Sequence, residues 1–254
     1  MKPKETTRGT IDLNADLGEG GAHDAAILAI VSSANIACGG HTGDAETMRI
    51  AIRLAKDHGV RIGAHPSFLD RDNFGRSPQH PPAELLFTQL CKQVDDLINI
   101  AEQENYGVTH LKPHGALYNQ AADDPLLAEV LIRVIQHCDP NLSLFGLAGS
   151  NLLQLAQASG IKIKAEAFAD RRYNSDGSLR ARRFADACID QDEEAVQQVL
   201  RLIRHQELCS IDGHLIHIKA DTFCVHGDGA HAVQLLSSIR QQLIACGYQI
   251  GSQS

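Results

Sequence analysis

VTHLKPHGALYN, residues 108–119, decides the fold that we predict for this chain. A short run typical of a strand ends here in two ionisable side chains, Lys112 and His114. Pro113 stiffens the exit from the strand, and Gly115 lets the backbone turn in a small space. Other parts of the chain repeat this step from a strand into a polar loop, so the segment indicates how the whole chain is built.

The repeated unit is a short strand-like run, a loop rich in glycine and histidine, and an amphipathic helix. Strand-like runs begin at Gly9, Val60, Val108, Asn141, Ile161 and Leu215, and the last of them is expected over residues 215–221. Helical patterns cover residues 45–58, with Asp44 as N-cap and Gly59 as stop, then about 83–104, 124–138, 193–205 and a closing stretch that Gly247 ends. The chain therefore reads as about six strong strand–helix units and one weaker unit.

Strands that alternate with helices predict a parallel sheet, which is either an open wound sheet or a closed barrel. Nearly every strand end carries ionisable residues, and a barrel collects its functional groups from many strand ends. We therefore predict an α/β fold, a (β/α) barrel of about seven strands that forms one domain over residues 10–254.

The composition excludes several classes of function. With 254 residues, 43% hydrophobic and 21% charged residues and a net charge of −8, the chain is typical of an ordinary globular protein and unsuited to nucleic acid. Its N-terminus lacks an apolar signal region and its apolar runs are too short for a membrane span, so we expect a cytoplasmic protein with no membrane partner. The seven scattered cysteines are expected to be reduced core residues, with Cys38 and Cys224 kept as alternative nucleophiles.

The first strand supplies acids that can share one face. Asp12, Asn14 and Asp16 lie two residues apart, so a strand that continues this far points all three to the same side. Neighbouring acids have split pKa values, and one of them can then act as a base. For Asp12 a capping or loop role is an equal alternative, whereas for Asp16 we favour a catalytic role.

Histidines follow three strands in equivalent positions, namely His41, His65 and His114. A single histidine at a strand end is more often structural, but three of them indicate a functional site. With Asp16 they suit zinc or another divalent ion, although neither HExxH nor HxH is present. The alternative is that the same residues act without metal, as acid, base and oxyanion partner.

Further polar groups are candidates for substrate binding. Lys112 suits a carboxylate or phosphate, or else a surface salt bridge. The segment EAFADRR contains Glu166, Asp170 and Arg171, whose arginine can clamp a carboxylate, and His226 precedes the closing helix. The sequence contains no GxxxxGK[ST], GxGxxG or GxSxG motif, so if ATP is used, another subunit is expected to bind it.

Taken in order, six motifs resemble the LamB/YcsF family over nearly the whole chain from Ile11 to Ile250. The motifs are DLNADLGEG, SANIACGGHTGD, GAHPSFLD followed by FGRS, THLKPHGALYN, EAFADRRYNSDGSL and DTFCVHGDGAHA. Residues 1–9 are an N-terminal extension outside the resemblance. Two departures stand out: Gly40 replaces a phenylalanine, and Gly21 lies where the family has Gly-Phe-Gly, so we expect a wider or looser pocket.

The resemblance implies a distorted (β/α) barrel similar to the glycoside hydrolase/deacetylase superfamily. It also implies opening of the 5-oxoproline (pyroglutamate) lactam to L-glutamate, with ATP as co-substrate and with the B and C subunits of 5-oxoprolinase as partners. Catalytic roles then fall to Asp16, His41, His65 and His114, and binding roles to Asn14, Lys112, Glu166, Asp170, Arg171 and His226. A bound metal would use Asp16, His65 and His114.

Three alternatives stay open at this point. The chain is compatible with a stand-alone metal-dependent amidohydrolase or deacetylase, and with a non-catalytic subunit that binds carboxylates. A homo-oligomer is also compatible with the sequence.

Overall fold

Strand β1 (Gly9–Leu17) organises the fold because three other strands pair with successive parts of it. The computed structural model describes residues 8–226 and 230–251, so residues 1–7 of the expected N-terminal extension lie outside the described part. Within that part, one eight-stranded parallel sheet runs in the order β10-β1-β2-β3-β4-β5-β6-β9. An additional pairing of β1 with β9 closes the sheet into a ring of seven strands, with β10 added outside it.

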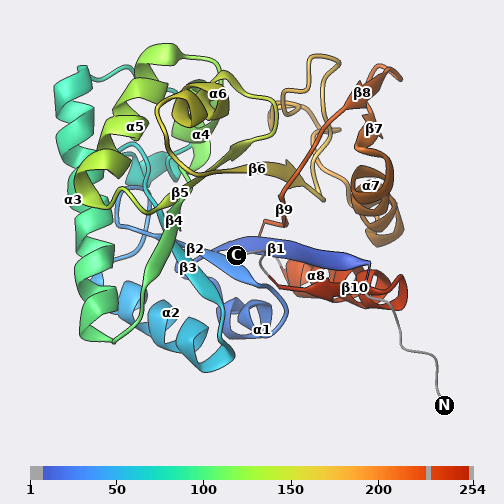
Figure 1. Cartoon of the computed structure of the whole chain (residues 1–254), viewed down its shortest axis with the longest axis horizontal. Coiled ribbons are helices and arrows are strands. Elements are labelled where there is room, and N and C mark those ends of the chain that lie inside the picture. The colour runs from blue at the N-terminus through green and yellow to red at the C-terminus, as the bar shows by residue number, and fades with distance from the viewer. Residues whose placement is uncertain (1–7, 227–229, 252–254) are drawn as a thin grey trace.

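The remaining strands of the large sheet are short, and all their pairings are parallel. They are β2 (Ser33–Ala37), β3 (Arg61–His65), β4 (Val108–Leu111), β5 (Ser143–Leu147), β6 (Ile163–Phe168), β9 (Thr222–Cys224) and β10 (Tyr248–Ile250). Figure 1 shows the strands of the ring at the centre and β10 beside α8, with α3 and α5 on one side of the ring and α7 and α8 on the other. The predicted barrel of about seven strands is therefore confirmed.

Helices cover the outside of the barrel. They are α1 (Asp24–Leu28), α2 (Ala45–His58), α3 (Ala83–Gln103), α4 (Gly115–Ala121), α5 (Pro125–Cys138), α6 (Asn151–Ala158), α7 (Asp192–His205) and α8 (Ala230–Ala245), with a 3₁₀ turn η1 (Arg71–Asn73). Their ends follow local chemistry. The Asp44 carboxylate accepts bonds from the backbone of Glu46 and Thr47, and Gly59 ends α2 in the left-handed region at φ 67°. The predicted helix boundaries of α2, α3, α5 and α7 hold to within one residue.

The alternation of side chains along β1 separates the two sides of the barrel wall. Leu13, Ala15 and Leu17 are buried in the hydrophobic core under the helices. The intervening Asp12, Asn14 and Asp16 bond polar groups of neighbouring strands inside the ring. The predicted common face of these three residues is confirmed, and it fills the barrel interior with polar groups.

The prediction for the last strand was wrong. Residues 215–221 do not enter the barrel: β8 (Leu215–His217) pairs only with β7 (Glu207–Cys209) in an antiparallel hairpin beside α7 (Figure 1). The barrel strand is instead the TFC segment at 222–224, directly after the range that we expected. Burial explains the difference, because Leu215 and His217 are exposed whereas Phe223 and Cys224 are buried.

In the described part of the chain, none of the helices combines the length and apolarity that crossing a membrane requires.

Candidate active site

A pocket of about 560 Å³ opens at the carboxyl ends of the barrel strands. Its floor includes Asp16, His65, Lys112 and His114, and His226 lies on its wall. These residues come from the ends of β1, β3, β4 and β9, or from the loops that follow them. The geometry of parallel strands thus brings together side chains that are more than 200 positions apart in the sequence.

Lys112 lies at the centre of the polar network. Its Nζ is 2.9 Å from Asp16 Oδ1 and 2.9 Å from Glu166 Oε1, and the side chain is only 2% exposed. Burial alone would lower the pKa of Lys112, but its interactions with Asp16, Cys224 and Glu166 outweigh that effect and raise the pKa well above its usual value. The lysine therefore stays charged between two buried acids, and the surface salt bridge that we kept as an alternative is wrong.

Asp16 is held on one side and open on the other. Its Oδ1 accepts bonds from Lys112 Nζ and from Asn35 Nδ2, both at 2.9 Å, while Oδ2 lies 3.4 Å from His65 Nε2. Burial raises the pKa of Asp16, but its interactions with His65 and Lys112 exceed that effect and hold the pKa well below its usual range. His110 Nε2 lies 2.8 Å from Asn35 Oδ1, so it orients the amide that in turn orients Asp16.

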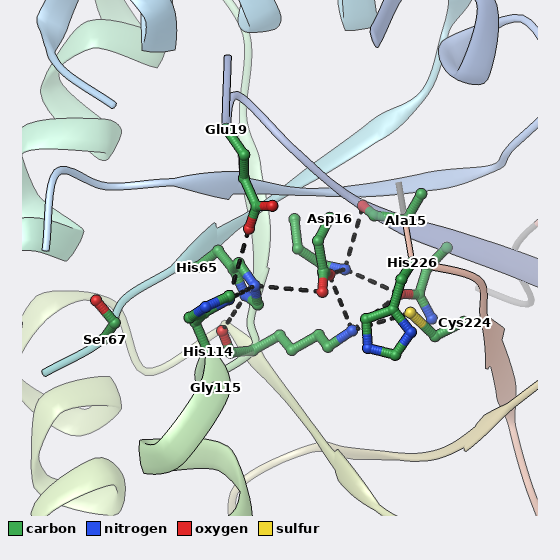
Figure 2. A network of polar contacts seen from close by, with 12 residues as sticks. Ala15, Asp16, Glu19, His65, Ser67, His114, Gly115, Cys224 and His226 are labelled. Carbon is green, nitrogen blue, oxygen red and sulfur yellow. Dashed lines mark hydrogen bonds and ion pairs between the residues drawn. The ribbon is translucent and has the colours of Figure 1, made fainter. Parts of the chain in front are cut away.

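Three histidines and one acid form a compact cluster next to Asp16. The rings of His41 and His114 stack with centroids 3.7 Å apart, and His65 packs edge-on against His114. Glu19 reaches toward them from the loop after β1, as Figure 2 shows for Glu19, His65 and His114. Burial, reinforced by the neighbouring His65, lowers the pKa of His41 to about 3 and lowers that of His114 still further.

Asp170 and His226 form a second acid–histidine pair on the pocket wall. Asp170 Oδ2 accepts from the His226 backbone N–H at 3.1 Å and lies 3.0 Å from His226 Nδ1. The His226 ring also stacks on Phe168, with centroids 5.2 Å apart. Burial raises the pKa of Asp170, but the charge and hydrogen bonds of His226 lower it to below its usual value. The acid fixes the orientation of the ring and leaves Nε2 for the pocket.

The mouth of the pocket is rich in arginine. Its lining includes Arg76, Arg171, Arg180, Arg182 and Arg183. Arg171 donates to the backbone carbonyls of Ala187 and Arg180, so it also fixes the long segment between β6 and α7. In a chain of net charge −8, this concentration of positive charge favours an anionic ligand at the mouth.

Other predicted residues lie one layer deeper. Asn14 bonds Thr222 and Asn35 below the pocket floor, and Glu166 is fully buried against Lys112. Gly40 does not border open space, because a Cβ there would collide with the side chains of Gln93 and Ser67, and the wider pocket expected from the missing aromatics stays a prediction. Neither cysteine is activated: burial raises the pKa of Cys38 to about 12 and that of Cys224 well above its usual value.

Glu19 is the cluster residue that our candidate set left out. It lies between Gly18 and Gly20, both in the left-handed region with φ of 73° and 81°. These two glycines turn the chain back over the barrel mouth, and the acid between them then faces the histidines. An acid flanked by glycines directly after a strand was the available signal.

The chain matches one protein-family model and close relatives. The model, described as the LamB/YcsF family, matches residues 11–254. A protein of Erwinia tasmaniensis, named as the A subunit of 5-oxoprolinase, is 48% identical over 242 residues, which cover 95% of this chain and 99% of that protein.

Solved structures give the same picture of the fold. The lactam utilization protein from Thermus thermophilus superposes with a TM-score of 0.90 at 34% identity, over 96% of this chain and 100% of the other. A putative cellobiose-phosphate cleavage protein from Enterococcus faecalis has a TM-score of 0.59 at 13% identity, over 97% of this chain and 98% of its own. The second likeness is one of fold alone.

Proposed function

Because the chain belongs to the LamB/YcsF family, we propose that it is the A subunit of a 5-oxoprolinase, a hydrolase that opens a cyclic amide. The substrate is 5-oxoproline and the product is L-glutamate. The reaction is coupled to ATP hydrolysis in the cytoplasm and requires B and C subunits. The relative that is 48% identical over 95% of the chain supports this proposal.

The observation that carries the proposal is the position of Asp16. One of its oxygens is held by Lys112 and Asn35, and the carboxylate lines the pocket beside His65. A carboxylate fixed in this way can take a proton from a water molecule as the water adds to the lactam carbonyl carbon. Lys112 and Glu166 keep the carboxylate in place, and we assign them this positioning role.

The ring nitrogen needs a proton when its bond to the carbonyl carbon breaks. His226 lies on the pocket wall with Nδ1 held by Asp170 at 3.0 Å, so its Nε2 is directed elsewhere. An imidazole oriented by an acid is a common arrangement for proton transfer. We assign His226 as the group that supplies this proton, and the leaving nitrogen becomes the amino group of glutamate.

The α-carboxylate of the substrate requires a positive partner. Lys112 already contacts two acids, whereas the arginines at the mouth line the open part of the pocket. Arginine binds carboxylates through two parallel hydrogen bonds. We therefore assign the substrate carboxylate to the arginine-rich mouth, with Arg182 and Arg183 as the main candidates.

The role of ATP follows from the substrate. A five-membered lactam is a stabilised amide, and transfer of the γ-phosphoryl group of ATP to its oxygen, with release of ADP, would make the carbonyl carbon more electrophilic. Addition of water and cleavage of the bond to the ring nitrogen would then leave the phosphoryl group on the new carboxyl group, and a second water would release inorganic phosphate and L-glutamate. The chain contains no phosphate-binding loop of the known motifs, so we assign ATP binding to the complex with the B and C subunits.

The test is glutamate release from 5-oxoproline by this protein mixed with its B and C subunits, with and without ATP. We expect release only when all three proteins and ATP are present. Release by this chain alone without ATP would identify a stand-alone amidohydrolase instead. Release by the B and C subunits without this chain would leave it a non-catalytic role, and either result overturns the proposal.

A further inference from the structure

Four side chains at the barrel mouth direct ligand-type atoms at one another. Glu19, His41, His65 and His114 follow the consecutive strands β1, β2, β3 and β4, except that His65 is the last residue of β3. One ligand atom from each of the four lies within 4.8 Å of all the others. The protonation of each ring follows from the partner of its second nitrogen.

His65 and His114 are each bound to a backbone carbonyl. His65 Nδ1 lies 2.8 Å from the carbonyl oxygen of Lys112, and His114 Nε2 lies 3.0 Å from that of Phe74. A carbonyl oxygen only accepts, so each of these nitrogens carries the proton of a neutral ring. The two remaining nitrogens, His65 Nε2 and His114 Nδ1, are then both lone-pair acceptors, yet they lie 2.9 Å apart.

His41 repeats this pattern against Glu19. The Ser67 hydroxyl donates to the carbonyl of Phe68 at 2.9 Å, so its oxygen accepts the bond from His41 Nδ1 at 3.0 Å. The other nitrogen, His41 Nε2, is then an acceptor that faces Glu19 Oε1 at 3.1 Å. The same carboxylate oxygen lies 3.5 Å from His114 Nδ1.

Acceptors that face acceptors need a positive charge between them. The side chains of His41, His65 and His114 are only 0%, 1% and 7% exposed, so bulk water has little access to the space between these groups. A single cation at the centre would satisfy all four groups at once. We propose that Glu19, His41, His65 and His114 bind one divalent transition-metal ion, with zinc as the best match.

The donor set and its spacing favour zinc over magnesium or calcium. Imidazole and carboxylate ligands suit zinc, whereas magnesium and calcium prefer oxygen ligands alone. Zinc bonds of about 2.0–2.1 Å place tetrahedral ligands about 3.4 Å apart. The separations of 2.9, 3.1 and 3.5 Å between the ligand atoms lie around that value.

This assignment replaces Asp16 by Glu19 in the expected metal set. In Figure 2 Glu19 approaches the histidines from above, whereas Asp16 lies to the right of His65, toward Cys224 and His226. Its Oδ1 is committed to Lys112 and Asn35. The role of the metal in lactam opening rests on the proposed function: His65 and His114 line the substrate pocket, where a bound metal would polarise a water molecule or the lactam carbonyl.

The experiment measures metal on the full-length protein without partner subunits. The chain is stripped with chelator, incubated with Zn²⁺, Co²⁺, Mn²⁺ or Mg²⁺, desalted and analysed by elemental mass spectrometry, and the Co²⁺ form is examined for its visible absorption. We expect about one zinc ion per chain, the absorption of low-symmetry nitrogen-ligated cobalt, and no retained magnesium.

Variants then separate the two candidate acids. Glu19→Gln should weaken zinc binding by roughly tenfold or more, since even indirect partners of a metal contribute that much. Asp16→Asn should keep about one zinc per chain, as should His110→Gln, a control histidine that is equally buried in the barrel. Circular dichroism confirms that each variant is folded.

A stripped wild-type chain that takes up none of the four metals overturns the inference, whatever the variants do. Loss of zinc in Asp16→Asn but not in Glu19→Gln overturns the choice of ligands. Glutamate release by metal-free protein in the complete complex would overturn a catalytic role for the metal and leave the proposed function intact. Zinc binding without lactam opening would overturn the proposed function and leave the metal site itself intact.

Discussion

Two acids on one strand, Asp12 and Asp16, show that the role of a buried carboxylate depends on its depth in the barrel. Both point inward from β1 and both are buried. Asp12 lies near the amino ends of the strands, where Ser32, Ser33 and Arg61 bond its Oδ1 at 2.6, 2.8 and 3.3 Å. Asp16 lies at the carboxyl ends, beside the pocket.

The difference lies in what surrounds each carboxylate. Asp12 is bound by two hydroxyl groups and an arginine, so it links strands β1, β2 and β3. Asp16 is placed among groups of unusual protonation, namely a buried charged lysine and a cluster of facing histidines. Such perturbed groups gather at functional sites. An aspartate therefore stabilises the barrel at the amino ends of the strands, whereas at the carboxyl ends it is placed for catalysis.

The largest effect is expected from Asp16→Asn. The amide cannot accept the proton of the attacking water, so kcat for glutamate release by the complete complex should fall about 100-fold or more. Asp12→Asn in the same assay is the matched control and should keep its kcat. Equal kcat values for the two variants would contradict the assignment of a catalytic role to Asp16 and a structural role to Asp12.

Lys112→Met tests the buried charges beside Asp16. The change leaves the carboxylates of Asp16 and Glu166 without their shared cation, and breaking a buried ion pair costs about 3–5 kcal/mol in the free energy of unfolding. Urea unfolding of the isolated chain measures this. Lys92→Met removes the exposed pair with Asp96 and is the control, for which the midpoint should hardly move. A Lys112 variant as stable as wild type would show that the two acids are not charged together.

A smaller effect on stability is expected for Asp12→Asn. The amide keeps the shape of the side chain but loses charged hydrogen bonds to Ser32, Ser33 and Arg61, which should lower the free energy of unfolding by about 1–3 kcal/mol. The same urea titration measures it. If the variant is as stable as wild type but inactive, the lower network is part of the catalytic machinery.

The smallest effect concerns the pH dependence of Asp170. Burial opposes its charge, but His226 more than compensates, so its pKa is lower in the folded state than the usual value of about 3.9. A carboxyl group whose pKa is lower in the folded state than in the unfolded state stabilises the fold at pH values above its unfolded pKa. This contribution fades as the pH falls below about 4. The difference in unfolding free energy between wild type and Asp170→Asn should therefore shrink between about pH 5 and pH 3. A difference that grows toward acid would reverse the assigned direction.

Local sequence signals predicted the elements well where capping residues and periodicity agree. Asp44 and Gly59 were predicted to mark the two ends of one helix, and each does so in the structure. The strand-end histidines were also found, because position at the end of a strand already implies position at the barrel mouth. The prediction for residues 215–221 was wrong because a short apolar run suits a hairpin strand as well as a barrel strand. Only burial by distant segments decides between these two structures.

Partners of side chains could not be predicted in the same way. Lys112 was assigned to substrate, but the fold brings Glu166 and Asp16 to it from strands far apart in the chain. Arg171 was assigned to a carboxylate, whereas two of its contacts are backbone carbonyls. The direction that Glu19 takes depends on two glycine dihedral angles. Such contacts are set by tertiary geometry, which periodicity does not contain.

The closure of the barrel by β1 and β9 has a consequence for how the protein is made. The pairing joins residues 12–14 to residues 222–224, so the ring is complete only after almost the whole chain has left the ribosome. Contacts between residues so far apart in the sequence form slowly, because closing the long intervening loop costs conformational entropy before the contacts add any stability. Asp16 from β1 and His226, which follows β9, meet only at that step. Glutamate release would thus report on complete closure, and a nascent or truncated barrel should hydrolyse nothing.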